Sequence, residues 1–66
     1  MISVKAIFDL SVYCAYTSKR YSYEYLSRDI SVDSYDKEEV LRVLMEELID
    51  PEDYYWRDYV IELRSF

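Results

Sequence analysis

The sequence of 66 residues contains no histidine, no glycine, one proline and one cysteine. Without histidine the chain lacks the usual general base near neutral pH, and no Ser-His or Cys-His nucleophile pair can form. Without glycine it cannot build the phosphate-binding loops of nucleotide enzymes or a glycine-dependent turn. These absences argue against an enzyme, and we expect no catalytic residue and no cofactor.

The single cysteine, Cys14, excludes a disulfide within the chain, and the lack of histidine excludes the usual four-ligand zinc site. Cys14 lies in an apolar pattern, which favours a buried structural thiol over a reactive one. The carboxylates from Asp50 to Asp53 lack the spacing and the glycine of a known calcium loop, so we expect no metal. One lone cysteine is also typical of a reducing, cytoplasmic location.

No apolar run approaches the ~20 residues that a membrane-spanning helix needs. Lys5 and Asp9 interrupt the first sixteen residues, which is unlike a signal peptide. We therefore expect neither a membrane span nor a membrane partner.

Acidic residues are concentrated in the C-terminal half of the chain. The formal net charge is −6, of which residues 1–32 contribute +1 and residues 33–66 contribute −7. An acidic surface attracts basic partners and repels phosphate backbones. Direct binding to nucleic acid is therefore not expected.

Two stretches have the period of β-strands. Every second residue from Ile2 to Tyr16 is apolar, which predicts a long strand with one buried face. After a polar turn at 17–20, a second strand is predicted at 21–26, and pairing Tyr16 with Tyr21 would place its tyrosines on the buried face. Apolar residues after 29 have the opposite parity, which requires a bulge near residues 27–29.

A helix is predicted from Lys37 to Ile49, ended by Pro51. Asp36 and Glu39 have the spacing of a capping box, with Ser34 as the alternative N-cap. The apolar stripe predicted to face the core consists of Leu41, Leu44, Met45 and Leu48, with Val40 beside it.

A last strand is predicted at 54–66. Its alternating apolar residues, Tyr59, Ile61 and Leu63, are odd-numbered, whereas Trp56 is even-numbered, so the face of Trp56 stays unassigned. The chain is then one small domain, residues 1–66, of the α+β class. Its predicted architecture is a two-layer ββαβ fold with strand order 2-1-3 and one helix on one face of the sheet. The other face is predicted to stay uncovered, with Ile7, Tyr13, Ala15 and Leu26 on it.

Nine tyrosines supply much of the apolar area of this short chain. Their positions in the patterns favour a structural role in the core and its rim for Tyr16, Tyr23, Tyr25 and Tyr59. For Tyr13, Tyr35, Tyr54 and Tyr55 a core role and a place in a binding surface are equally favoured, because tyrosine among carboxylates is typical of protein-binding surfaces.

These patterns favour a protein-binding module that docks on a basic, nucleic-acid-binding surface of a partner protein and occludes it. Carboxylates would attract the partner, and the aromatic residues after them would anchor it. The candidate partner-binding residues are Glu38, Glu39, Glu46, Glu47, Asp50, Glu52, Asp53, Tyr54, Tyr55 and Trp56.

In size, acidity and tyrosine content the chain resembles the small inhibitors of phages and other mobile elements: anti-CRISPR proteins, anti-restriction nucleic-acid mimics and glycosylase inhibitors. That resemblance implies action in the host cell cytoplasm, and it carries over no residue roles because no motif is shared. The alternative is a homodimeric assembly protein that uses the uncovered sheet face.

Overall fold

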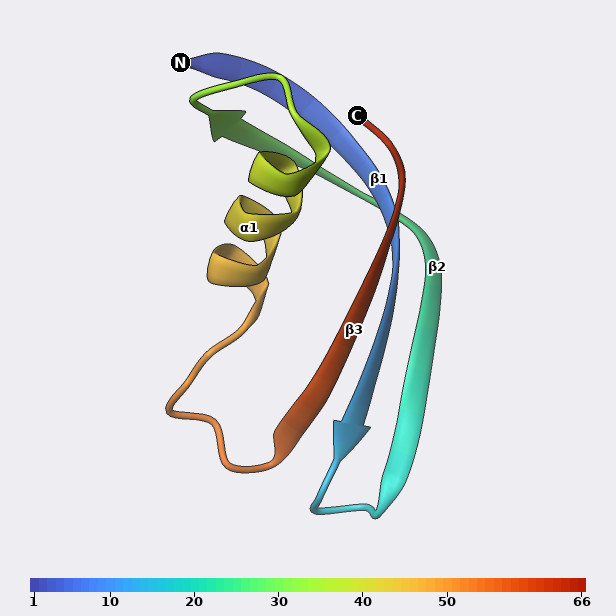
Figure 1. Cartoon of the computed structure of the whole chain (residues 1–66). Helices are drawn as coiled ribbons and strands as arrows, with labels where there is room; N and C mark the ends of the chain where they lie inside the picture. The colour runs from blue at the N-terminus through green and yellow to red at the C-terminus, as the bar shows by residue number, and fades with distance from the viewer.

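A computed structural model describes all of residues 1–66 and contains three strands and one helix (Figure 1). Their order is β1 (Ile2–Cys14), β2 (Lys19–Val32), α1 (Lys37–Leu48) and β3 (Trp56–Ser65). The sheet has the order β2-β1-β3, and both pairings are antiparallel. The predicted α+β fold with a central first strand is confirmed. In Figure 1 the strands bend strongly, and α1 lies on the concave side of the bend.

The β1–β2 hairpin is four residues out of the predicted register, because Tyr21 lies opposite Val12 and not opposite Tyr16. Val12 pairs with Tyr21, and Cys14 pairs with Lys19. A shift by an even number of residues keeps every side chain on its face of the sheet, so the faces predicted for Tyr21 and Tyr23 are correct despite the error. Tyr16 has no strand partner and lies in the turn beyond β1.

The parity break in β2 lies earlier than the predicted 27–29. Leu10 pairs with Tyr23 and Phe8 with Leu26, so two residues of β2 face Asp9 alone. Tyr25, at this bulge, has a φ of 56°, an unusual conformation for a non-glycine residue. Leu26 therefore shares the face of Phe8 and packs against the core, and its predicted place on the uncovered face is wrong.

A second bulge explains the unassigned face of Trp56. The β1–β3 register shifts between Ser11 and Tyr13, and Asp58 beside this shift has a φ of 54°. The extra residue reverses the parity of β3 and sets Trp56 opposite Cys14. Trp56 consequently belongs to the concave face.

The core is small and lies under the helix. Its seven buried residues are Val4, Ala6, Phe8, Ile30, Val32, Val40 and Leu44. The helix face differs from the predicted stripe: Val40 and Leu44 are fully buried, Val43 and Leu48 pack beside them, and Met45 is exposed. The helix is thus rotated toward Val40.

The ends of α1 differ slightly from prediction. Asp36 is the N-cap residue, but its side chain makes no capping hydrogen bond, so the predicted capping box does not form. The last residue of α1 is Leu48, and Ile49 already has an extended conformation. The chain then runs through an exit loop, residues 49–55, to β3.

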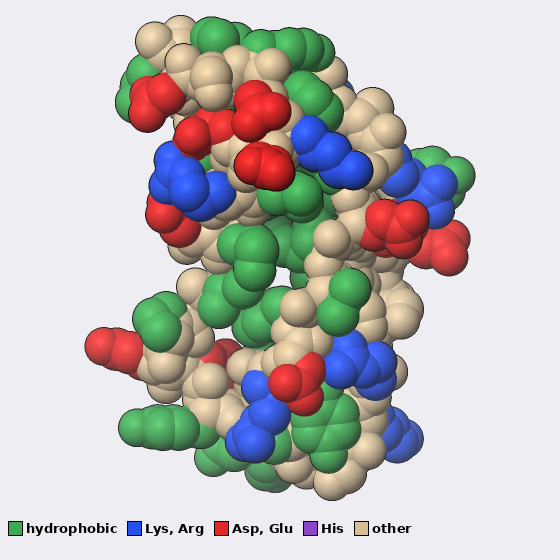
Figure 2. Space-filling view, in the orientation of Figure 1, with side chains coloured by type: hydrophobic (Ala, Val, Ile, Leu, Met, Phe, Trp, Pro, Cys, Tyr) green, Lys and Arg blue, Asp and Glu red, His purple; other side chains and the backbone are tan.

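The molecule is elongated, with extents of 38 × 23 × 16 Å. Its radius of gyration is 12.5 Å, against about 11 Å for a compact domain of this length. Figure 2 shows hydrophobic side chains between the helix-bearing part and the hairpin end. The helix therefore covers only part of the concave face.

Candidate aromatic binding site

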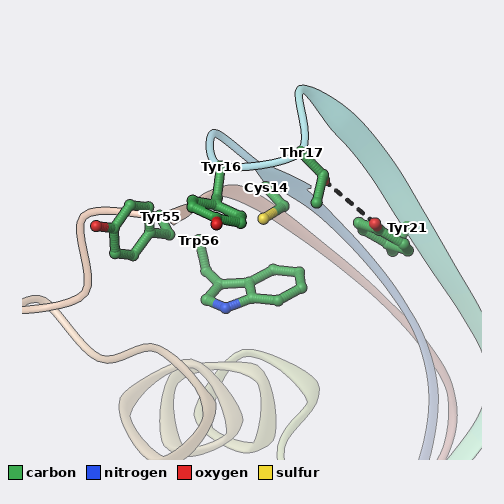
Figure 3. Close-up of a pocket in the computed structure, with 6 residues that line it drawn as sticks. All are labelled: Cys14, Tyr16, Thr17, Tyr21, Tyr55 and Trp56. Atoms are coloured by element: carbon green, nitrogen blue, oxygen red, sulfur yellow. Dashed lines mark hydrogen bonds between the residues drawn. The ribbon is translucent and has the colours of Figure 1, made fainter.

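The largest hollow lies at the hairpin end of the concave face, beyond the reach of α1. It has a volume of about 400 Å³, and we call it the aromatic hollow; its lining residues are Cys14, Tyr16, Thr17, Tyr21, Tyr55 and Trp56. Figure 3 shows that they come from the end of β1, the β1–β2 turn, the start of β2, the end of the exit loop and the start of β3. Small-molecule and side-chain pockets are typically apolar with few polar groups, as here.

The rings of the aromatic hollow form two pairs. Tyr16 and Tyr55 meet edge to face, with ring centroids 5.6 Å apart and planes 86° apart. Tyr21 and Trp56 lie 5.7 Å apart at 55°. Tyr16 is 79% exposed and Tyr55 is 54% exposed. The rings therefore stabilise each other and still present much of their surface to solvent.

Hydrogen bonds fix the walls of the hollow. The Ala15 backbone N–H donates to the Tyr55 carbonyl oxygen at 2.6 Å, which joins the two walls directly. The Tyr21 hydroxyl is 3.1 Å from Thr17 Oγ1 (dashed in Figure 3). A site fixed in this way loses little conformational entropy when a ligand binds.

Two acids of the exit loop position its aromatic residues. Asp53 Oδ1 accepts hydrogen bonds from the backbone N–H groups of Tyr55 at 2.9 Å and Trp56 at 3.3 Å. Asp50 Oδ1 accepts from the Glu52 N–H at 2.9 Å. Such Asp-backbone bonds stabilise tight turns. Asp50 and Asp53 thus orient the backbone that carries Tyr55 and Trp56.

The helix carboxylates differ from those of the loop, because three of them form ion pairs within the chain. Arg42 bridges Glu39 and Glu46. Arg28 of β2 lies 3.2 Å from Glu47. Glu38 and Glu52 form no ion pair and are exposed. The helix therefore offers a partner less free negative charge than the sequence indicates.

The ten predicted partner-binding residues divide into two groups. Tyr55 and Trp56 line the aromatic hollow, and the exit loop brings Asp50, Glu52, Asp53 and Tyr54 next to them in the chain. Glu38, Glu39, Glu46 and Glu47 lie on α1 instead.

Sequence reasoning missed the other half of the hollow. Tyr16, predicted to be in the core, is exposed, and Tyr23 and Tyr25 are exposed as well, so the prediction of a core role is wrong for these three. Tyr59 is half-buried. The alternating pattern correctly gave the face of Tyr21 and Tyr23, but it carries no information about whether a helix covers that part of the face.

The other predicted surface tyrosines differ among themselves. Tyr54 is 82% exposed. Tyr35 is exposed, but its ring packs on Phe66 and its hydroxyl donates to the Phe66 carbonyl oxygen. Tyr13 is half-buried between Arg20 and Arg57 on the uncovered face. Tyr35 and Tyr13 are thus engaged within the fold, whereas Tyr54 is free.

A second cluster lies at the β2 bulge, on the convex face. The Arg64 guanidinium carbon is 4.0 Å from the centroid of the Tyr25 ring, and Nη2 is 2.7 Å from Asp9 Oδ2. The hydrogen bonds from Arg64 and from the Tyr25 backbone N–H lower the pKa of Asp9. The cluster joins all three strands and stabilises the bulge.

Two further groups of the concave face have shifted pKa values. A hydrogen bond with the Thr17 backbone lowers the pKa of Cys14, a residue only 4% exposed. Burial raises the pKa of Tyr59, and the charges of Asp53 and Asp50 raise it further. The negative field of the exit loop therefore reaches the concave face.

The structure contains no group of three or more Cys, Asp or Glu side chains placed to hold a metal ion. Its one helix lacks the length and apolarity needed to cross a membrane.

The chain matches no protein-family model, no curated protein and no solved structure.

Proposed function

We propose that this protein is a small protein-binding module that docks the aromatic hollow and the exit loop on a basic surface of a partner protein and occludes that surface. The observation that carries the proposal is the exposure of Tyr16 and Tyr55 in one preformed hollow. Exposed aromatic residues gathered at one place are typical of protein interaction sites.

The size of the chain strengthens this argument. Only nine of the 66 residues are buried, so the domain has little apolar surface to spare. Four rings that could have enlarged the core instead line an open hollow. Their arrangement supports a role outside folding, because burial of large rings would stabilise a small domain strongly.

The negative charge of the exit loop favours a partner whose surface is positively charged. Asp50, Glu52 and Asp53 flank the aromatic residues, and none of them forms an ion pair within the chain. They would attract a basic surface and speed association. A basic surface of this kind is typical of proteins that hold nucleic acid, so docking there would inhibit such a partner in the cytoplasm, as phage inhibitors do.

A pull-down with a matched pair of variants tests the proposal. Tyr55→Ala removes a ring of the hollow, whereas Tyr54→Ala removes a neighbouring exposed ring that does not line it. The wild type and Tyr54→Ala should recover one basic protein from lysate of the host cell, and recovery should fall steeply with salt. Tyr55→Ala should lose about tenfold or more in affinity.

Two results would contradict the proposal. One is a captured protein that binds equally well to Tyr55→Ala and to the wild type. The other is binding that is indifferent to salt, since a complex between an acidic loop and a basic surface must weaken as ions screen it.

A further inference from the structure

We propose that the aromatic hollow receives the guanidinium group of an arginine side chain of the partner. This inference rests on the proposed function and names the chemical group that the site recognises. It depends on the ring faces, on the absence of an internal cation, and on the nearby carboxylates.

The rings of the hollow provide the surfaces that bind cations. Four aromatic side chains line it, and their pairs are inclined at 86° and 55°, so their faces point in several directions. In Figure 3 the Trp56 indole lies beneath Tyr16, with Tyr55 and Tyr21 on either side. A cation near such faces is attracted by the electrons of each ring, most strongly by tryptophan.

No cation of the chain occupies this hollow. Its lining contains no lysine or arginine, and the one internal cation–π contact lies at Tyr25 instead. The ring faces of Tyr16, Tyr55 and Trp56 are therefore available to a side chain from outside.

The bulge on the convex face shows the same chemistry completed within the chain. There the Arg64 guanidinium stacks 4.0 Å from the Tyr25 ring centroid. It also forms an ion pair with Asp9 at 2.7 Å and donates from Nη1 to the Tyr25 hydroxyl at 3.0 Å. The aromatic hollow has the tyrosines and the nearby carboxylates of that arrangement, and no arginine of the chain lines it.

The carboxylates of the exit loop supply the opposite charge. Asp53 is bonded to the backbone of Tyr55 and Trp56, which places its negative charge beside two rings of the hollow. Its charge also acts on Cys14, whose thiol lines the hollow, because it opposes the lowering of the Cys14 pKa. A cation entering the hollow would therefore meet a negative field as well as ring faces.

These features favour arginine over lysine. A guanidinium is planar, stacks flat on rings, sheds its water more readily than an ammonium and can bond a carboxylate with two N–H groups. A lysine ammonium is compact and strongly hydrated, so it gains less from an open aromatic site.

The fluorescence of Trp56 reports occupancy directly, since it is the only tryptophan of the chain and lines the hollow. The wild-type protein would be titrated with three acetylated, amidated pentapeptides that differ only in the central residue: arginine, lysine or citrulline. Citrulline has nearly the shape of arginine without its charge. We expect the arginine peptide to shift the Trp56 emission with a dissociation constant of about 1 mM, the affinity typical of a single weak contact.

The other two peptides and the two variants test which feature of arginine is recognised and where it binds. The lysine peptide should bind about fivefold more weakly and the citrulline peptide about tenfold more weakly, because each loses stacking or charge. Tyr55→Ala should abolish the arginine response, whereas Tyr54→Ala should keep it. Far-UV circular dichroism of both variants checks that they are folded.

Equal binding of the citrulline peptide would overturn the inference, and so would equal binding of the lysine peptide or no response to any peptide. These comparisons use the wild-type chain, so they do not depend on a variant that folds. None of these failures would refute the proposed function, which is judged separately by the salt dependence of the pull-down and by its Tyr54 and Tyr55 variants.

Discussion

The two ends of the concave sheet face have the same sequence pattern, but only one of them lies beneath the helix. At one end Val4, Ala6 and Phe8 are buried beneath α1. At the other end the face continues into the open aromatic hollow, where Tyr16 and Tyr55 are exposed. The alternation of apolar residues predicts a buried face at both ends, because it does not indicate which part of the sheet a helix covers. The difference arises from the element that covers the sheet.

Helix length explains why only one end is covered. The twelve residues of α1 span about 18 Å at 1.5 Å per residue. The thirteen residues of β1 would span about 43 Å if flat. One short helix therefore covers about half of the strand. On the other half Val12 and Cys14 are still buried, but the aromatic hollow beside Cys14 stays open.

The largest expected effect is at the covered end. Leu44→Ala removes a fully buried side chain from the contact between helix and sheet, and should lower the free energy of unfolding by about 2–5 kcal/mol. For so small a domain that is a large part of the total. Met45→Ala, at the next and exposed position, should cost less than about 1 kcal/mol.

Urea unfolding followed by circular dichroism measures both variants. If Met45→Ala proved as destabilising as Leu44→Ala, the helix would face the sheet through the predicted stripe, and the structural account of the covered end would be wrong.

The next effect concerns the position of the exit loop. Asp53→Ala removes the acceptor for the Tyr55 and Trp56 N–H groups, and should cost about 1 kcal/mol of stability while weakening partner binding. Asp53→Asn keeps an oxygen acceptor, so it should restore the stability but only part of the binding, because the charge is lost. Equal weakening of binding in the two variants, relative to the wild type, would show that the partner needs the charge of Asp53 and not its turn.

Charge reversals compare the loop with the helix. Glu52→Lys changes an acid without an ion pair beside the aromatic residues, whereas Glu47→Lys changes one that Arg28 already neutralises in part. Glu52→Lys should slow association with the partner by about threefold at low salt, and Glu47→Lys should slow it less. Stopped-flow or surface-binding kinetics would measure both rates. A larger effect of Glu47→Lys would place the docking surface on the helix.

The smallest effect is expected at the convex-face cluster. Because the folded state lowers the pKa of Asp9, its carboxylate stabilises the fold above the unfolded pKa, and this contribution is lost as pH falls below about 4. Asp9→Asn should flatten this acid dependence slightly. Urea midpoints measured between about pH 7 and about pH 3 would show it. A steeper loss of stability in Asp9→Asn than in the wild type would contradict the assignment.

The fold was largely predictable because its main determinants are local patterns. The alternation from Ile2 predicted the central strand, and the spacing of apolar residues after Lys37 predicted the helix. The bulges were not predictable in place, since they depend on distant contacts: Asp9 with Tyr25, and Arg64 with both. The capping hydrogen bond predicted for Asp36 does not form, and this too depends on side-chain geometry that the sequence pattern does not specify.

The site was only half predictable for a related reason. Tyr55 and Trp56 follow an acidic connector, and this local context pointed to a surface role. Tyr16 in the β1–β2 turn and Tyr21 in β2 complete the hollow. Nothing in the sequence around these two residues distinguishes them from core residues. The ion pair between Arg28 and Glu47 joins elements far apart in the chain, so the reduced charge of the helix was also hidden.

Photo-crosslinking in the host cell would locate the docking surface on the protein. A photoreactive phenylalanine analogue would replace one of three exposed residues: Tyr54 beside the hollow, Glu46 on the helix, or Ser27 opposite Ile7 on the convex face. We expect a crosslink from position 54 to a basic protein and none from position 27. A crosslink from position 27 alone, above all one between two copies of this chain, would contradict the account and favour the assembly protein instead.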